Sequence, residues 1–211
     1  MISRKAGLYN DRMGKNSQTS HSRIGFFGGS FDPVHLGHFL LAQKALEISS
    51  LDLILFCPAF HAPLRSQKPL FSPELRLKML NEISKDDERM KICTLELEKQ
   101  KTCFTYHTLL EIRNIYPNSE LFVLLGADQF ERLNQWKYHH ELVQICKFLV
   151  FSRDSFNASP PAIPSLSFRL IKNDLIEISS TQIRKRLQDG KSIDEFVPSS
   201  IHPIINNFFQ S

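Results

Sequence analysis

Residues 24–38 read IGFFGGSFDPVHLGH. The apolar run at 24–27 is typical of a short strand that is buried on both faces of a parallel sheet. Gly28 and Gly29 follow it, and because they lack a Cβ the backbone can turn tightly there and a ligand can approach its N–H groups. The next segment, 36–48, has apolar residues at helical spacing. The stretch therefore predicts a strand, a turn and a helix in direct succession.

Two histidines stand at the start of that helix. His35 and His38 are one turn apart on the same face, beside the free backbone N–H groups that attract anions, and Gly37 between them keeps the first turn uncluttered. One histidine at such a place more often caps or packs than binds a ligand. The glycine pair, the His-x-Gly-His spacing and the preceding strand together favour a phosphate site over that structural alternative.

Length and composition describe a single globular domain. The chain has 211 residues, of which 42% are hydrophobic and 23% charged, so it can bury a sizeable core. The net charge of +4 comes from residues 1–23, which hold five Lys or Arg residues and one Asp, and the remainder holds 21 charges of each sign. This balance argues against bulk nucleic-acid binding. We expect residues 1–22 to be a disordered or loosely attached arm and residues 23–211 to be the domain.

The cysteines and the apolar runs indicate the compartment. Cys57, Cys93, Cys103 and Cys146 form no CxxC pair and no zinc-finger spacing, which favours reduced core thiols over disulfides. No apolar stretch approaches the ~20 residues that cross a bilayer, and the N-terminal segment has no apolar signal region. We therefore expect a cytoplasmic protein with no membrane partner.

The order of apolar and polar runs indicates the fold class. Strands and helices alternate through most of the sequence, which predicts an α/β fold with a Rossmann-like, doubly wound, mainly parallel sheet and helices on both faces, in a single domain. The expected strands are 24–27, 53–57, 91–97, 121–125, 148–151 and one or two short strands in 168–178. The expected helices are 36–48, 73–83, 106–116, an interrupted one at 130–145, one that ends near 188, and 203–209.

Local signals refine two of these helices. Ser72-Pro73-Glu74 offers an N-cap, a proline and an acid at the start of the second helix, and Thr105 can cap the helix that follows it. Arg76 lies near the start of the second helix, where a solvated arginine and a substrate-facing one are equally compatible with the pattern.

Further polar groups follow other strands. Gly126-Ala127-Asp128 comes directly after the strand at 121–125, and Ile178-Ser179-Ser180-Thr181-Gln182-Ile183-Arg184 places three hydroxyls and an arginine at the start of a helix. In open α/β sheets ligands bind where the strands end, so these elements and the glycine loop could converge on one edge. Trp136 has polar neighbours, which favours one ring face that is open for stacking.

The pattern excludes several chemistries. It contains neither Gly-x-Gly-x-x-Gly nor the Walker sequence, so hydride transfer with a dinucleotide and P-loop hydrolysis are disfavoured. No Ser-His-Asp elbow or HExxH zinc site competes. Two histidines at a helix start, with a hydroxyl cluster that carries an arginine, suit a triphosphate whose charge shifts onto a leaving pyrophosphate.

These motifs carry a family resemblance. Residues 28–38 and 178–184 resemble the HxGH nucleotidyltransferase superfamily. Combined with CFTYHTL at 103–109, Gly126-Ala127-Asp128 and LNQW at 133–136, they make the chain similar to bacterial nicotinate-nucleotide adenylyltransferases from about residue 23 to residue 209.

The resemblance implies an activity and a site. The 5′-phosphate of nicotinate mononucleotide would attack the α-phosphorus of ATP and give deamido-NAD and pyrophosphate, with Mg²⁺ carried on the ATP phosphates and no metal bound by the protein. Catalysis would consist of positioning and charge stabilisation. The implied catalytic residues are His35, His38 and Arg184. The implied ATP-binding residues are Gly28, Gly29, Ser30, Phe31, Gly37, Gly126, Asp128, Ser179, Ser180 and Thr181. The implied contacts to the nicotinate nucleotide are Arg65, Thr105 and Trp136.

Three departures from the family pattern lie on the acceptor side. His107 stands where the family usually has Asp, Leu64 stands where it usually has His, and 153–155 read Arg-Asp-Ser in place of Arg-Pro-Gly. The alternatives are an adenylyltransferase of the same superfamily with another acceptor, nicotinamide mononucleotide or a phosphopantetheine, and a non-catalytic nucleotide- or RNA-binding module that uses the basic arm. A monomer and a homo-oligomer are both compatible with the sequence.

Overall fold

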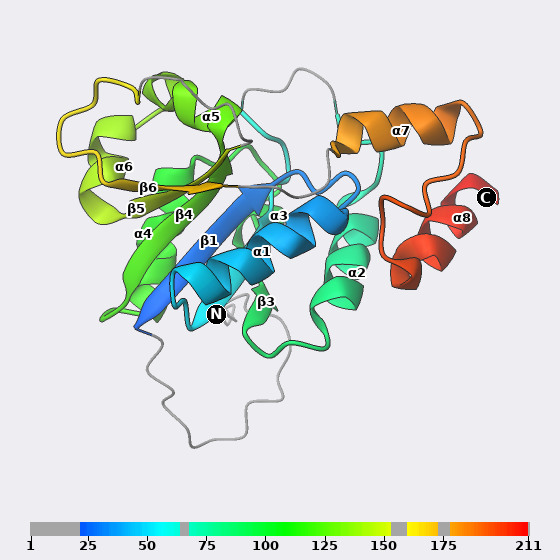
Figure 1. Ribbon diagram of the computed structural model, residues 1–211, viewed down its shortest axis with the longest axis horizontal. Coiled ribbons are helices and arrows are strands. Elements are labelled where there is room, and N and C mark those ends of the chain that lie inside the picture. Colours follow the sequence, from blue (N-terminus) through cyan, green and yellow to red (C-terminus); the bar gives the residue numbers. More distant parts are fainter. Residues whose placement is uncertain (1–21, 64–67, 153–159, 173–177, 211) are drawn as a thin grey trace, which may run out of the picture.

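The sheet has six strands, all parallel, in the order β3-β2-β1-β4-β5-β6. The computed structural model describes residues 22–63, 68–152, 160–172 and 178–210 (Figure 1). The strands are β1 Arg23–Gly29, β2 Leu53–Pro58, β3 Met90–Ile92, β4 Glu120–Gly126, β5 Lys147–Ser152 and β6 Phe168–Lys172. The chain changes direction across the sheet between β1 and β4. In open sheets of this kind, the crevice at the carboxyl ends of such a strand pair is where ligands bind.

Helices cover both faces of this sheet, as the sequence predicts. They are α1 Leu36–Ile48, α2 Pro73–Ser84, α3 Leu95–Glu98, α4 Thr105–Ile115, α5 Ala127–Glu131, α6 His139–Ile145, α7 Ser180–Gln188 and α8 His202–Gln210, with 3₁₀ turns η1 Leu133–Gln135 and η2 Ser199–Ile201. Two separate apolar cores result. One packs α1, α2, α7 and α8 on one face, and the other packs α4, α5 and α6 on the opposite face.

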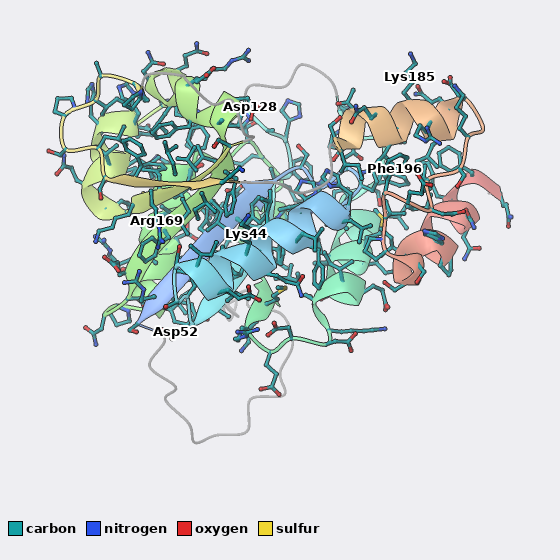
Figure 2. All side chains as sticks on the ribbon, in the orientation of Figure 1. Lys44, Asp52, Asp128, Arg169, Lys185 and Phe196 are labelled. Carbon is teal, nitrogen blue, oxygen red and sulfur yellow. The ribbon has the colours of Figure 1, made fainter. Side chains whose placement is uncertain are left out.

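The strands supply side chains to both cores in alternation. In β4, Phe122 and Leu124 belong to the first core, whereas Leu121, Val123 and Leu125 belong to the second. This explains why the strands read as continuous apolar runs rather than alternating ones. The outer strand β6 is fastened to α1 by the guanidinium of Arg169, which donates to the carbonyl of Ile48 at 2.9 Å (Figure 2).

Several helix boundaries follow the expected signals. The hydroxyl of Ser72 accepts a hydrogen bond from the N–H of Leu75, with Pro73 as the first helical residue of α2. The hydroxyl of Ser179 caps α7 by accepting from the N–H of Gln182.

Two local expectations were wrong. The strand expected at 91–97 ends at Ile92. The hydroxyl of Thr94 donates to the carboxylate of Glu98 and the carbonyl of Thr94 accepts from the N–H of Glu98, which starts the short helix α3. Thr105 does not cap α4: it is the first helical residue, and Phe104 occupies the cap position. The interruption expected in the helix at 130–145 is confirmed, since the segment is divided into α5, η1 and α6, with Tyr138 in the left-handed region at φ 66° between η1 and α6.

The expected arm lies outside the described residues except for Ser22, whose N–H and hydroxyl both donate to Asp52. All four cysteines are free and buried. Within the described ranges, no helix is both long and apolar enough to span a bilayer.

Candidate active site

The loop from β1 to α1 lies at the carboxyl edge of the sheet. Gly28 and Gly29 end β1, and the left-handed conformation that the turn needs falls on Phe31, at φ 46°. A Cβ on Gly28 would lie 2.7 Å from the Phe26 ring, and one on Gly29 would lie 3.3 Å from the Phe31 ring. The two glycines therefore make room for aromatic rings at the end of the strand, and the strained turn residue is a phenylalanine.

The two histidines meet at the start of α1. Their rings stack with centroids 3.7 Å apart and planes inclined by 29°. The backbone N–H of His35 donates to the ring atom Nδ1 of His38 at 3.3 Å. Because Nδ1 of His38 accepts this bond, the proton of a neutral His38 ring is on Nε2. His35 is 6% exposed, and burial lowers its pKa to about 4, so its ring is neutral at pH 7.

Gly37 is required by the position of His35. A Cβ at this residue would lie 3.0 Å from Nδ1 and 3.1 Å from Cε1 of His35, and 3.4 Å from a methyl group of Ile178. The expectation that a glycine keeps the first helical turn uncluttered is thus met by a specific contact.

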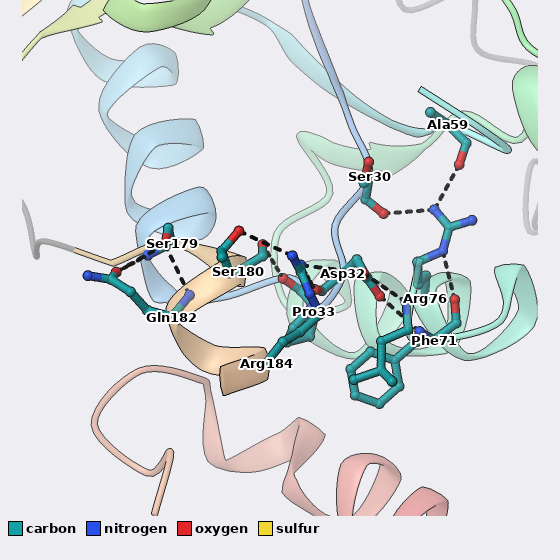
Figure 3. Close-up of polar contacts among 12 residues, drawn as sticks. Ser30, Asp32, Pro33, Ala59, Phe71, Arg76, Ser179, Ser180, Gln182 and Arg184 are labelled. Atoms are coloured by element: carbon teal, nitrogen blue, oxygen red, sulfur yellow. Dashed lines mark hydrogen bonds and ion pairs between the residues drawn. The ribbon is translucent and has the colours of Figure 1, made fainter. Parts of the chain in front are cut away.

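Helix α7 is docked on the turn that precedes α1 (Figure 3). The guanidinium of Arg184 donates to the carbonyl of Asp32 at 2.8 Å and lies 3.4 Å from its carboxylate. The hydroxyl of Ser180 donates to the carbonyl of Pro33 at 3.0 Å, and Arg184 also donates to the hydroxyl of Thr181 at 3.1 Å. The structure therefore brings the hydroxyl cluster and the histidine loop together, although they are some 150 residues apart.

Asp32 organises this junction, a role that the sequence does not indicate. It is 2% exposed, and its two carboxylate oxygens accept from the N–H groups of Leu70 and Phe71 at 2.9 Å. One carboxylate thus joins the turn after β1, the segment before α2 and Arg184. In the sequence, Asp32-Pro33 reads only as a turn signal, and nothing there indicates these long-range partners.

Arg76 matches neither expected alternative. It is neither solvated nor open to a substrate, because it is fully buried and donates to the carbonyls of Ser30, Ala59 and Phe71 at 2.7, 2.8 and 3.2 Å (Figure 3).

Asp128 lies at the same edge of the sheet, at the end of β4 (Figure 2). It is exposed, and its carboxylate folds back toward Gly126, where a Cβ would lie 2.7 Å from the carboxylate oxygen. Gly126 therefore leaves room for this carboxylate at the end of β4.

The implied acceptor residues lie on α4 and beside α6. Thr105 and Trp136 are half-buried, and Trp136 packs against the second core. Next to them, His107 packs edge-on against Tyr138 with ring centroids 4.7 Å apart, and the ammonium of Lys137 lies 4.8 Å from the centroid of the Phe104 ring. Leu64, Arg65 and 153–155 lie outside the described residues.

The chain matches one family model and many curated proteins. The model is that of cytidylyltransferase-like proteins, and it matches residues 26–186. A nicotinate-nucleotide adenylyltransferase of Methylacidiphilum infernorum is 34% identical over 188 residues, which cover 89% of this chain and 91% of that protein. Enzymes of the same name from Opitutus terrae and Shouchella clausii are both 37% identical, over 83% and 87% of this chain and 91% and 93% of their own lengths.

Solved structures share the fold. A nicotinic acid mononucleotide adenylyltransferase of Plasmodium falciparum, complexed with NaAD, superimposes with a TM-score of 0.73 at 22% identity and covers 89% of this chain and 96% of its own. The same enzyme complexed with APC gives a TM-score of 0.72 at 21% identity, and the match covers 90% of this chain and 96% of that one. The chain therefore shares its six-stranded parallel architecture with these solved structures.

Proposed function

Because this chain belongs to the nicotinate-nucleotide adenylyltransferase family, within the cytidylyltransferase-like proteins, we infer that it transfers AMP from ATP to nicotinate mononucleotide. The products are deamido-NAD and pyrophosphate, so the chain is a nucleotidyltransferase of NAD biosynthesis. The observation that carries this inference is identity with the named relatives over almost the whole domain. The docking of α7 on the turn before α1, which gathers His35, His38 and Arg184, supports it.

The ATP half of the site consists of α1, α7 and the loop after β1. A phosphate oxygen of the acceptor attacks the α-phosphorus while the bond to the pyrophosphate oxygen breaks, so negative charge grows on the leaving group. We propose that His35, His38 and Arg184 donate to the triphosphate, and that Ser179, Ser180 and Thr181 bind its β and γ end. The N-terminus of α1 and the backbone N–H groups of 29–31 would add donors that need no reorganisation.

Ribose and metal complete that half. We propose that Gly126 and Asp128 contact the ribose. A Mg²⁺ carried on the ATP phosphates would neutralise charge on the pyrophosphate.

The acceptor half differs because it holds a flat, charged ring. We propose that Trp136 stacks on the pyridine, that the hydroxyl of Thr105 hydrogen-bonds its carboxylate, and that Arg65 contributes from the segment between β2 and α2. The half-buried state of Trp136, with its apolar support from the second core, fits a fixed stacking platform.

An acceptor panel tests the function. The protein is incubated with ATP, Mg²⁺ and one of nicotinate mononucleotide, nicotinamide mononucleotide or 4′-phosphopantetheine, and pyrophosphate release and the adenylylated product are both measured. We expect the highest kcat/KM with nicotinate mononucleotide. If one of the other acceptors is adenylylated and nicotinate mononucleotide is not, that other acceptor replaces the proposed one. If none of the three acceptors gives ATP-dependent pyrophosphate release, this acceptor class is rejected altogether.

A further inference from the structure

Arg76 is a fully buried cation that no part of the proposed reaction uses. It lies in the first turn of α2, and its three hydrogen bonds go to carbonyls from three different segments: Ser30 after β1, Ala59 after β2 and Phe71 before α2 (Figure 3). Its second terminal nitrogen, Nη2, is buried without a hydrogen-bond partner among the described residues.

A guanidinium at this place is not explained by packing. Burial disfavours the charged form and lowers the pKa of Arg76, although the charge of Asp32 works against this effect and an arginine stays protonated at neutral pH. The Asp32 carboxylate makes its hydrogen bonds to Leu70 and Phe71 and pairs with Arg184. Among the described residues, carbonyl oxygens alone therefore accept the hydrogen bonds of Arg76, and a buried apolar side chain would avoid the desolvation cost.

The carbonyl of Ser30 belongs to a strained part of the loop. The next residue, Phe31, has φ 46°, a conformation that costs free energy for a large side chain and persists only where its surroundings hold it. Arg76 makes the shortest of its three bonds, 2.7 Å, to this carbonyl. The strand before it is held as well, since the N–H of Ala59 donates to the carbonyl of Gly29 at 2.9 Å.

A peptide plane links this contact to the ATP site. The C=O of Ser30 and the N–H of Phe31 belong to one planar group and point in opposite directions. When Arg76 fixes the carbonyl, it also fixes the direction of the Phe31 N–H, which lies in the segment 29–31 that would hold a phosphate. A charged donor on the carbonyl also polarises the peptide and strengthens its N–H as a donor.

We propose that Arg76 is a positioning residue for ATP: it holds the Ser30–Phe31 peptide so that the backbone N–H is aimed at the nucleotide phosphates. This inference rests on the proposed function only in that the ligand at the loop is ATP. It assigns a role in substrate alignment to a side chain that never touches the substrate.

The test uses Arg76→Met and Arg76→Lys, with Met79→Ala as the matched control. Met79 is a fully buried residue of the same helix that packs in the first core, so its truncation destabilises α2 while the hydrogen bonds from Arg76 to the loop remain. Affinity for MgATP is measured by calorimetry without acceptor, kcat and KM by product formation, and stability by thermal unfolding.

We expect Arg76→Met to weaken MgATP binding about tenfold, the effect of one hydrogen bond to a charged group. Its kcat should fall by ~10²-fold, because misplacement of a bound group by about an ångström has that effect. Its KM for nicotinate mononucleotide should change less than twofold. Arg76→Lys keeps the charge and can replace one of the hydrogen bonds, so its MgATP affinity and kcat should lie between those of the wild type and of Arg76→Met. Met79→Ala should lose thermal stability and keep both MgATP affinity and kcat.

Wild-type MgATP affinity and kcat in folded Arg76→Met would overturn the proposal. If that variant does not fold, wild-type values in Arg76→Lys would overturn it instead. Equal losses of MgATP affinity in Met79→Ala and the Arg76 variants would reduce the role to fold stability. A wild-type protein that binds MgATP but adenylylates no pyridine nucleotide would reject the proposed function and leave the calorimetric test of Arg76 intact.

Discussion

The imidazole rings of His35 and His38 stack with centroids 3.7 Å apart, and the N–H of His35 is aimed at Nδ1 of His38. Because the backbone N–H of His35 is the donor, this bond sets the hydrogen-bonding role of the His38 ring. His35 is a buried neutral ring, and His38 carries its proton on Nε2, so the pair can offer N–H donors to an anion without two adjacent positive charges.

Replacement of His38 by alanine should lower kcat by ~10²–10³-fold, because it removes one preorganised donor to the developing charge. His140→Ala is the control, since His140 is exposed on α6. Single-turnover rates at saturating ATP report the chemical step, and circular dichroism reports the fold. Turnover close to that of the wild type would remove His38 from the site.

The pKa of His35 makes stability depend on pH. In the folded chain the pKa is lowered to about 4, against 6.5 for an ordinary histidine, so between these values the unfolded chain binds more protons. Stability is therefore complete above about pH 6.5 and declines as the pH falls toward 4, by about 3 kcal/mol from this group alone. Urea unfolding at pH 7 and pH 4 should show a smaller decline for His35→Asn. An identical decline in the two proteins would contradict the buried neutral ring.

Gly37→Ala should lower activity without loss of stability. Alanine favours a helix over glycine by about 1 kcal/mol, but the new Cβ must displace the His35 ring, which it would approach to 3.0 Å. We expect kcat to fall at least about tenfold. Gly190→Ala should lower stability and leave kcat unchanged. Its φ of +65° strains an alanine, and no atom lies within 4 Å of the added Cβ. Equal kcat values for the two variants would show that the contact with His35 has no catalytic role.

Asp32→Asn should lower both the stability of the fold and kcat/KM for ATP. The carboxylate accepts two backbone N–H bonds and pairs with Arg184, and removal of one partner from a buried pair costs about 3 kcal/mol. Asp87→Asn is the matched control, because its pair with Arg89 is partly exposed, with the two side chains 24% and 56% exposed, and should contribute less than about 1 kcal/mol. Chemical unfolding and kcat/KM for ATP measure the two effects. Loss of stability with an unchanged kcat/KM would separate Asp32 from the function of Arg184.

Trp136→Ala should raise KM for the pyridine nucleotide and leave KM for ATP unchanged, because stacking of a base on an aromatic ring contributes about 1–3 kcal/mol. Trp136→Phe keeps a stacking surface and should recover most of the affinity. Initial rates with each substrate varied in turn give both constants. A change confined to KM for ATP would refute the stacking role.

Most of the fold could be predicted from local chemistry. Continuous apolar runs such as 121–125 indicate strands that are buried between two layers of helices. The hydroxyls of Ser72 and Ser179 cap the helices that follow them, and Pro73 occupies the first helical position of α2. The missed strand end lies where local hydrogen bonds compete with the strand pattern. The hydroxyl of Thr94 donates to the carboxylate of Glu98 and its carbonyl accepts from the N–H of Glu98, so α3 starts in the middle of the expected strand.

The part of the candidate site that could not be predicted depends on long-range partners. Arg76 and Asp32 have ordinary local surroundings in the sequence, and their roles come from carbonyl and N–H groups that lie 17 to 46 and 38 to 39 residues away. Periodicity and motif spacing carry no signal for such contacts. Only the folded chain shows that a buried cation and a buried carboxylate hold the loop on which the histidines stand.

The fate of the α-phosphate of ATP tests the central claim most directly. With nicotinate mononucleotide, Mg²⁺ and ATP labelled at the α-phosphorus, the label should appear in deamido-NAD, and with ATP labelled at the γ-phosphorus it should appear in pyrophosphate. If the α-label stays in ATP, or appears in AMP through hydrolysis, while nicotinate mononucleotide remains unchanged, the account is contradicted.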